Sequence, residues 1–260
     1  VLPGRLAVLI GAGGAGPARL AAFAPAKRWD PGENIVSPYL WSRRVKRLEV
    51  AVIPSGNLDG FESILQNFAV AEIWYPAILA AQPNNDSTSV AWQRLWEEAR
   101  RRGTAEREVR PGESLRLGST LFEVFGLPSG TRGGASAGDP PLSFRIVNHE
   151  GSALVAEGLS GPAAQPLLHA GVDVRSLVFA TDGETMTSAA SDLLQKVAPR
   201  IVVVAPGSGP RENPSVAAVP QPEASSIHFL RTDLQGATTV EMRGSLFAVW
   251  TFRGGRLVLP

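Results

Sequence analysis

The polar loop at residues 55–60 is the stretch whose residue types and position most favour chemistry. The apolar run before it, residues 48–53, is rich in β-branched side chains and predicts a strand. Apolar residues then recur at helical spacing, at Phe61, Ile64, Leu65 and Phe68. A strand, a polar loop and a helix in this order place the loop at the carboxyl end of a strand, where α/β proteins bind ligands.

Few other residues in the sequence offer catalytic or metal-binding chemistry. There is no cysteine, and the three histidines, His149, His169 and His228, form no closely spaced pair. Zinc sites need cysteine, histidine or carboxylate donors, so histidine spacing predicts no zinc site. A phosphate-binding P-loop and a nucleophile elbow are also absent from the sequence, since Ser160 lacks the second glycine of the elbow.

A glycine loop near the beginning of the chain offers a second site of interest. Gly11, Gly13 and Gly16 match the spacing of a dinucleotide-binding fingerprint. That fingerprint needs an acidic residue at the end of the next strand. Asp30 and Glu33 stand at about the right distance but lie in a predicted turn. We therefore expect a plain glycine-rich turn here, with nucleotide binding as a weaker alternative.

Three stretches carry a resemblance to a known family. They are VSPYLWSRRVKRLEVAVI at 36–53, SLVFATDGETMTSAASDLLQKVAPRIVVVAPG at 176–207 and HFLRTDLQGATTV at 228–240. In this order they resemble the metallo-β-lactamase-like domain of the ComEC family of DNA-internalisation competence proteins. The resemblance implies an α/β fold, an αββα sandwich of two mixed sheets packed face to face with helices on the outer faces. It also implies one domain over residues 1–260, cut from a longer membrane protein.

The same resemblance identifies where metal ligands of the family would stand, and most are replaced. In the first loop Ser55, Asn57 and Gly60 occupy ligand positions and only Asp59 is retained. The later ligand positions are occupied by Gly158, Thr181, Asp182 and Asn213. Glu157 precedes Gly158 by one residue, and a slip of one residue reverses the direction of a strand side chain. The resemblance therefore implies a pseudo-enzyme without metal or other cofactor and without a small-molecule substrate.

Two alternatives remain open for the acids of the loops. Asp59 and Asp182, with Glu157, would form a rebuilt site of a metal-dependent nuclease or hydrolase, because paired carboxylates hold Mg²⁺ or Ca²⁺. Alternatively, Asp59 caps the helix that we expect to start at Gly60, where its oxygens would accept from free N–H groups.

Charge is concentrated at the beginning of an otherwise nearly neutral chain. The 260 residues carry a net charge of +1, but residues 1–50 hold eight Lys or Arg against three acids. Arg43, Arg44, Lys46 and Arg47 cluster beside Trp41 at the end of a predicted helix, and a second run spans residues 100–102. Such runs are typical of solvated helix ends. They also suit phosphate contacts with single-stranded DNA.

The remaining patterns predict the order of helices and strands along the chain, and the resemblance implies where in the cell the protein lies. The resemblance implies a soluble, extracytoplasmic domain of a bacterial inner-membrane protein of natural transformation, in contact with its other domains. No apolar run in the sequence reaches the length of a membrane span. We expect buried strands at 6–10, 48–53 and 201–204, a turn at 30–32, helices at 34–44 and 87–102, a hairpin turning at 148–151, and a low-complexity loop at 128–141.

Overall fold

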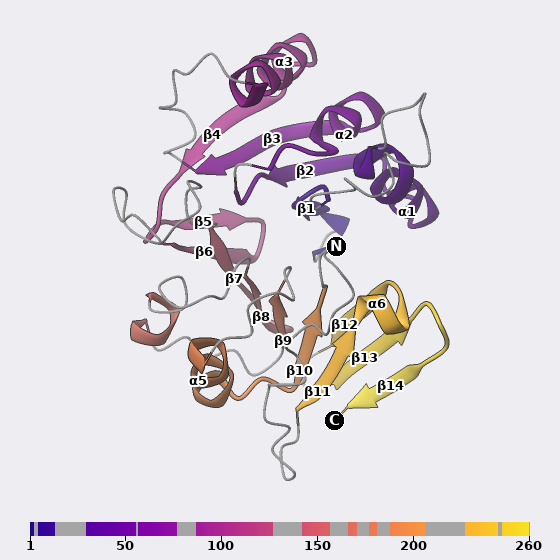
Figure 1. Cartoon of the computed structure of the whole chain (residues 1–260), viewed down its shortest axis with the longest axis vertical. Helices are drawn as coiled ribbons and strands as arrows, with labels where there is room; N and C mark the ends of the chain where they lie inside the picture. Colours follow the sequence, from indigo (N-terminus) through magenta and orange to yellow (C-terminus); the bar gives the residue numbers. More distant parts are fainter. Residues whose placement is uncertain are drawn as a thin grey trace. The chain divides into compact units, whose positions relative to one another are not determined.

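The chain forms two compact units, the first ending at Arg110 and the second beginning at Pro111. The computed structural model describes residues 1–2, 5–13, 30–55, 57–76, 87–126, 142–156, 166–170, 177–180, 188–205, 227–243 and 246–259. Both units combine helices with β-sheets (Figure 1). The predicted α/β class is confirmed, while the single sandwich domain over the whole chain stays a prediction.

A fully parallel four-stranded sheet forms the base of the first unit, with neighbours in chain order. Its strands are β1 (Val8–Ile10), β2 (Arg47–Val52), β3 (Ala69–Pro76) and β4 (Ala105–Val109). The helices between them are η2 (Gly32–Val36), α1 (Ser37–Ser42), α2 (Phe61–Asn67) and α3 (Ser87–Arg101). Parallel neighbours require crossovers of this kind. The prediction of a mixed sheet is therefore wrong for this unit, because each pair of consecutive strands is joined by a crossover.

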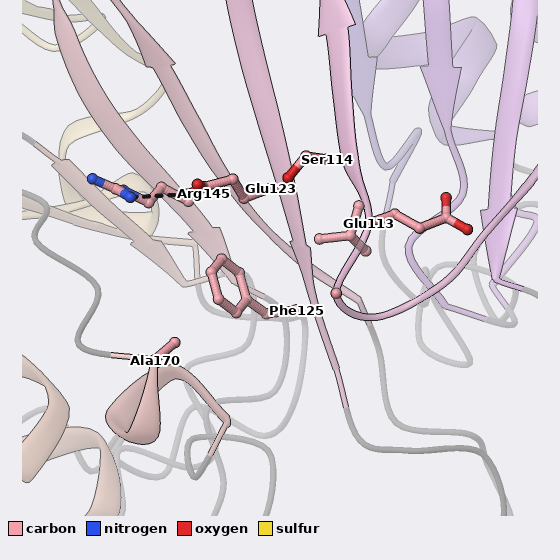
Figure 2. A pocket seen from close by; sticks show the side chains of 8 residues that line it. Glu113, Ser114, Glu123, Phe125, Arg145 and Ala170 are labelled. Atoms are coloured by element: carbon pink, nitrogen blue, oxygen red, sulfur yellow. Dashed lines mark hydrogen bonds and ion pairs between the residues drawn. The ribbon is translucent and has the colours of Figure 1, made fainter.

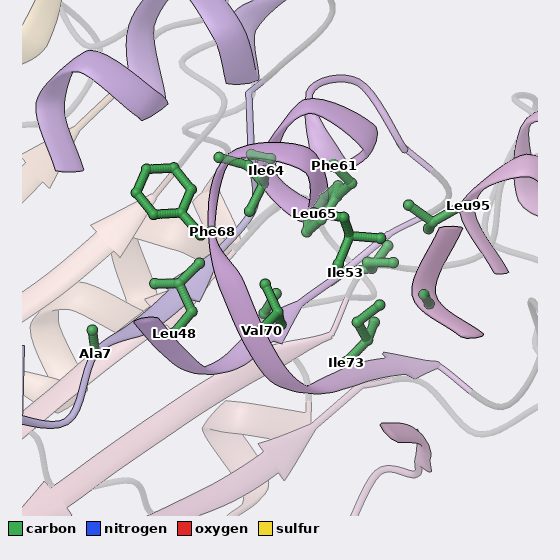
Figure 3. Close-up of a cluster of buried hydrophobic side chains, with 13 residues drawn as sticks. Ala7, Leu48, Ile53, Phe61, Ile64, Leu65, Phe68, Val70, Ile73 and Leu95 are labelled. Carbon is green, nitrogen blue, oxygen red and sulfur yellow. The ribbon is translucent and has the colours of Figure 1, made fainter. Parts of the chain in front are cut away.

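The hydrophobic core of the first unit lies between this sheet and its helices, as Figure 3 shows. Helix α2 contributes Phe61, Ile64 and Leu65, which are at most 2% exposed. Strand side chains such as Leu48 and Ile73 meet them and are fully buried. Burying one such side chain stabilises the fold by about 1.5–3 kcal/mol. The helical spacing seen in the sequence is thus the spacing that points α2 at the sheet.

The second unit contains a seven-stranded mixed sheet and a three-stranded antiparallel sheet. The large sheet has the order β11-β10-β9-β8-β7-β6-β5, from β5 (Ser114–Leu117), β6 (Thr120–Phe125), β7 (Ser143–Asn148), β8 (Gly151–Ala156), β9 (Leu177–Ala180), β10 (Ile201–Val204) and β11 (His228–Arg231). Strands β5 to β8 pair antiparallel, and β8 to β11 pair parallel. The small sheet comprises β12 (Thr238–Arg243), β13 (Leu246–Thr251) and β14 (Arg256–Leu259).

Strand β10 is buried on both faces in this unit. Val202 and Val204 join a core cluster that includes residues of α5 (Ser188–Val197). Ile201 and Val203 join a different cluster with Phe247 of the small sheet. Alternate side chains of a strand point to opposite faces, which explains why a continuous apolar run sits here. Two sheets therefore pack face to face within the second unit, and the predicted buried strand at 201–204 is confirmed.

The other two predicted strands differ in outcome. The strand at 48–53 is confirmed, since Leu48, Val50, Val52 and Ile53 are at most 1% exposed. The strand at 6–10 is shorter than predicted, and all three residues of β1 are only half-buried. The prediction of a buried strand there is wrong, because β1 stands at the edge of its sheet and pairs only with β2 among the described residues.

The helix predicted at 34–44 begins two residues earlier and ends at Ser42. Asp30 starts it, because the N–H of Glu33 donates to Asp30 Oδ1 at 2.9 Å. Pro31 already has helical backbone angles (φ −65°, ψ −31°). The predicted turn at 30–32 is wrong for that reason. An aspartate followed by proline is as typical of a turn as of the start of a helix, so the sequence pattern does not separate the two.

Two local predictions are confirmed closely. The helix predicted at 87–102 is α3, which ends one residue earlier and is followed by Gly103 at φ +68°. The hairpin β7–β8 turns at Asn148, whose Oδ1 accepts from the N–H groups of Glu150 and Gly151 at 2.8 and 3.2 Å. The loop predicted at 128–141 lies outside the described residues.

Candidate functional site

The loop between β2 and α2 holds the four candidate residues that the structure describes at this strand end. Ser55 and Asn57 are half-buried, Asp59 is exposed and Gly60 is buried. The loop follows the buried end of β2, as the strand–loop–helix pattern predicts. The candidates are thus at the carboxyl end of a parallel strand, and what they can do depends on their individual contacts.

Asn57 is committed to holding the loop together. Its Nδ2 donates to the carbonyl oxygen of Gly13 at 3.1 Å, and its Oδ1 accepts from the N–H of Asp59 at 2.9 Å. Both bonds use the side-chain amide, one to the glycine loop of the sequence and one within its own turn. The amide therefore acts as a structural tie between two loops.

Asp59 does not cap helix α2, and the prediction that it does is wrong. The residue directly before the helix is Gly60, and no side chain makes a capping hydrogen bond there. Main-chain hydrogen bonds form here instead. The N–H of Ile64 donates to the carbonyl oxygen of Gly60 at 3.0 Å, and the N–H of Phe61 donates to the carbonyl oxygen of Leu58 at 3.1 Å. Asp59 stands one residue too early for the cap position and is exposed to solvent.

Gly60 is enclosed by main-chain atoms of two other segments. A Cβ added at Gly60 would lie 2.6 Å from the carbonyl oxygen of Ala12 and 2.6 Å from the nitrogen of Gly32. The backbone of Gly60 is also in the left-handed region, with φ +83°. Any side chain would therefore need a shift of rigid backbone as well as a strained conformation. Gly60 is one of the positions where the family resemblance would place a histidine or aspartate ligand.

The remaining candidate metal positions lie outside the described residues. These are Gly158, Thr181, Asp182 and Asn213, together with Glu157 of the alternative rebuilt site. The structure therefore neither joins them to Asp59 nor separates them from it. Among the residues that the structure does describe, no group of three or more His, Cys, Asp or Glu side chains is arranged to hold a metal ion.

The basic cluster lies at the end of α1 and combines exposed cations with exposed aromatic rings. Arg43, Arg44 and Lys46 are exposed, and Trp41 keeps 50% of its surface exposed while its ring lies 5.9 Å from that of Phe68. Tyr39 is 44% exposed on the same short helix. Sequence analysis identified the cations and Trp41 but missed Tyr39, because a lone tyrosine in a predicted helix gives no sign of its exposure.

Arg47 differs from its three neighbours. Its Nε lies 2.9 Å from Glu49 Oε1, and the hydrogen bond from its guanidinium to Glu49 raises the pKa of Arg47. Arg47 is thus already paired with an acid on its own strand. As a predicted DNA contact it is the weakest member of the cluster, since binding phosphate would compete with Glu49.

The three arginines at the end of α3, residues 100–102, form ion pairs with acidic side chains. Arg101 and Arg102 both pair with Glu98, which is only 3% exposed, and Arg100 lies 3.7 Å from Glu106. Glu98 is a buried acid that the sequence analysis missed, although its spacing to Arg102 is one helical turn. These three arginines therefore neutralise acids at the end of the helix, which is a structural role.

A hollow of about 230 Å³ lies in the second unit (Figure 2). Strand residues Glu123, Phe125 and Arg145 line it, with Ser114 on β5 and Ala170 opposite. Glu123 and Arg145 form an ion pair at 2.9 Å, marked in Figure 2. The ion pair joins the carboxylate of Glu123 to the only cation among the described residues of the lining, and Ser114 and Glu113 also line the hollow. No sequence motif pointed to it.

The histidines are dispersed, as their spacing predicts. His149 lies in the β7–β8 turn with its Nε2 3.0 Å from Glu150, His169 is exposed, and His228 opens β11. In the part of the chain that the structure describes, no helix has the length and apolar character needed to cross a membrane.

Comparison with known proteins finds likeness of fold alone. No family model and no curated protein matches this sequence. Unliganded yeast PDE1 is similar with a TM-score of 0.50 and 10% identity, over 71% of this chain and 66% of that chain. YhfI from Bacillus subtilis, a metallo-β-lactamase fold protein, aligns over 96% of this chain and 89% of its own at 10% identity, with a TM-score of 0.48.

A more distant likeness covers only part of a larger protein. CmlA, a diiron β-hydroxylase from Streptomyces venezuelae, aligns over 61% of this chain with 15% identity and a TM-score of 0.42. This chain spans 35% of that protein's length. Identities this low concern the fold alone, and the fold of this chain is α/β. Activity does not follow from them.

Proposed function

We propose that this chain is a non-catalytic, metallo-β-lactamase-like domain of a ComEC-type DNA-uptake protein. In this proposal it contacts single-stranded DNA by its surface and otherwise touches other domains of the same membrane protein, on the extracytoplasmic side. It binds no small-molecule substrate and no cofactor. The single observation that carries the proposal is the enclosure of Gly60 by the main chains of Ala12 and Gly32.

This enclosure supports a non-catalytic role because it removes the space for a metal ligand. Ser55, Asn57 and Gly60 replace ligand positions in the resembling family, and the amide of Asn57 is occupied by Gly13 and Asp59. Asn, Ser and Gly are poor donors for zinc compared with histidine, cysteine or carboxylate. One exposed carboxylate, Asp59, remains at this strand end, and a single carboxylate holds a divalent ion weakly.

The alternative function is a metal-dependent nuclease or hydrolase with a rebuilt site around Asp59 and Asp182. Thermal unfolding with and without Mn²⁺ or Zn²⁺ separates the two. A ligand at a hundred times its dissociation constant stabilises the folded state by about 2.7 kcal/mol. We expect no upward shift of the melting temperature. A clear shift that Asp59→Ala abolishes would favour the rebuilt site.

The DNA part of the proposal is supported by the cluster of Trp41, Arg43, Arg44 and Lys46. In the described part of the chain none of these three cations is joined to an acid by an ion pair, and Trp41 is half exposed. Arginine and lysine neutralise phosphates, while an exposed indole stacks on bases without reading their sequence. This composition favours weak, sequence-independent binding to a single strand.

Fluorescence anisotropy with a labelled single-stranded oligonucleotide tests this contact. Binding should weaken with salt, with a log–log slope of about −0.7 for each phosphate contacted. The double variant Arg43→Glu with Arg44→Glu should abolish it. Arg116→Glu, an exposed cation on β5, is the matched charge control and should have little effect.

Asp59→Ala should also leave DNA binding unchanged, because Asp59 is outside the cluster. Equal loss from Asp59→Ala and from the double arginine variant would instead show that the strand-end loop is the working site.

A further inference from the structure

The turn between β13 and β14 presents a second exposed surface, far in sequence from the basic cluster. Phe252 in this turn is 84% exposed, and Leu234 of the short helix α6 (Thr232–Gln235) is 58% exposed. We call Leu234 and Phe252 the apolar tip. Figure 1 shows α6 beside the strands of the small sheet. Exposed apolar side chains that gather in one place mark surfaces that bind other molecules.

The apolar tip is held by main-chain hydrogen bonds. The N–H of Phe252 donates to Ala237 O at 2.9 Å, and that of Arg253 donates to Gln235 O at 3.0 Å. Arg253 Nη1 also donates to Leu234 O at 3.2 Å. Gly236 permits this approach, since a Cβ there would lie 2.9 Å from Phe252 Cβ. The turn and α6 therefore form one rigid support that keeps both side chains outward.

Two exposed arginines follow Phe252 closely in the chain. They are Arg253 and Arg256, and the Arg256 guanidinium lies 5.8 Å from the centre of the Trp250 ring. Arg231 pairs with Asp233 at 2.7 Å, so that acid does not cancel the other arginines. Residues 227–260 hold four arginines and two acids. The outer face of the same sheet adds Leu246 and Val258, each about half exposed.

We propose that the apolar tip docks on a lipid bilayer that carries anionic headgroups. Phe252 and Leu234 enter the boundary between headgroups and acyl chains, while Arg253 and Arg256 contact lipid phosphates. A projecting pair of apolar side chains with cations at its base matches the layering of a bilayer surface, which is apolar below and anionic above. The charge complementarity favours a bilayer over a second copy of this basic segment, which would repel it.

Co-sedimentation of the full chain with vesicles tests this proposal. Vesicles of phosphatidylcholine alone are compared with vesicles that also contain phosphatidylglycerol. We expect salt-sensitive binding to the anionic vesicles only. Phe252→Ser should weaken the binding constant about tenfold or more, since the apolar burial of one phenyl ring is lost. Arg256→Gln should weaken it about fivefold, the value of one cation near an anionic surface.

Controls keep the result specific to the apolar tip. Val90→Ser removes an exposed apolar side chain (46% exposed) from α3, outside the apolar tip, and should leave vesicle binding unchanged. Phe252→Leu should restore most of the binding lost in Phe252→Ser, which separates insertion from misfolding. Absence of binding to either vesicle type would overturn the proposal. Vesicle binding that survives Phe252→Ser but is lost in the double variant Arg43→Glu with Arg44→Glu would overturn it as well. The proposal would also fail if the chain bound an acidic protein and no lipid vesicle.

Discussion

Gly60 is where a single residue most constrains what this molecule does. Its main chain lies against Ala12, in the loop after β1, and against Gly32, the first residue of η2. The family resemblance implies that a metal ligand is replaced at this position, but it does not imply that the space is also filled. That second fact depends on a contact between residues far apart in the chain, which no local pattern reveals.

Gly60→Ala should lower the free energy of unfolding by about 2–4 kcal/mol, because strain at positive φ adds to a clash with backbone. Gly103→Ala is the matched control, since Gly103 has φ +68° and nothing within 4 Å of an added Cβ. It should cost only the strain, about 1 kcal/mol. Urea unfolding followed by circular dichroism measures both. Equal costs for the two variants would mean that the close approach at Gly60 contributes nothing.

Tyr75 gives a prediction about pH. Burial, followed by the nearby acids Glu106 and Glu108, raises the pKa of the Tyr75 phenol above its ordinary value of 10.0. The folded state then keeps this proton after the unfolded state has lost it, so stability should fall as pH rises above about 10. Tyr75→Phe should remove that part of the alkaline loss. Ultraviolet titration of the phenol, compared between the two proteins, reports the shift directly.

The role of Asn57 marks the limit of prediction at the site. Its type and its place in the loop were predictable, and so was the loop at the end of β2. Its bond to Gly13, across 44 residues of sequence, was not, because only the folded sheet brings those loops together. The same holds for Tyr39, whose exposure depends on which side of α1 faces the core.

At the scale of elements, two aspartates near helix starts behave differently. Asp30 accepts the N–H of Glu33, whereas Asp59 makes no cap at α2. We therefore expect Asp30→Ala to cost about 1 kcal/mol of stability through loss of a cap. Asp59→Ala serves as the matched control and should stay within about 0.5 kcal/mol of the parent, as exposed positions do. Thermal unfolding of the two variants decides, and a larger cost at Asp59 would contradict the assignment.

Helices and strands with a strong hydrophobic pattern were predictable from the sequence. Features that depend on which strands pair with one another were not. Helix α3 follows from its apolar spacing, and Leu95 and Ala99 are buried as that spacing requires. The strand at 201–204 follows from its continuous apolar run. Strand β1 has a similar run, yet it lies at a sheet edge and is half-buried, because composition does not say how many neighbours a strand has.

At the scale of the whole molecule, each of the two units contains a core cluster of its own. Ile64 belongs to the core cluster between α2 and the parallel sheet, and Leu193 to the cluster that α5 forms in the second unit. Both are fully buried, so truncation to alanine should cost about 2–5 kcal/mol in either case. Because tryptophans 41, 74, 92 and 96 lie in the first unit, fluorescence mainly reports its unfolding.

We therefore expect Ile64→Ala to move the fluorescence transition in urea much more than Leu193→Ala does. Circular dichroism, which also reports the strands of the second unit, should respond to both variants. Identical shifts of the fluorescence transition by the two substitutions would show that the units unfold as one cooperative body.

The parallel sheet of the first unit also has a kinetic consequence. Val8 pairs with Val50, and Val50 with Glu72, so each strand finds its neighbour only after a long loop has closed. In the small antiparallel sheet Val240 pairs with Val249, only nine residues further along the chain. Closing a long loop costs conformational entropy before any strand pairing can offset it. The parallel sheet of the first unit should therefore form more slowly than the small antiparallel sheet. During refolding, amide protons of β12 to β14 should thus become protected from exchange before those of β1 to β4, so the end of the chain would acquire its order ahead of the beginning.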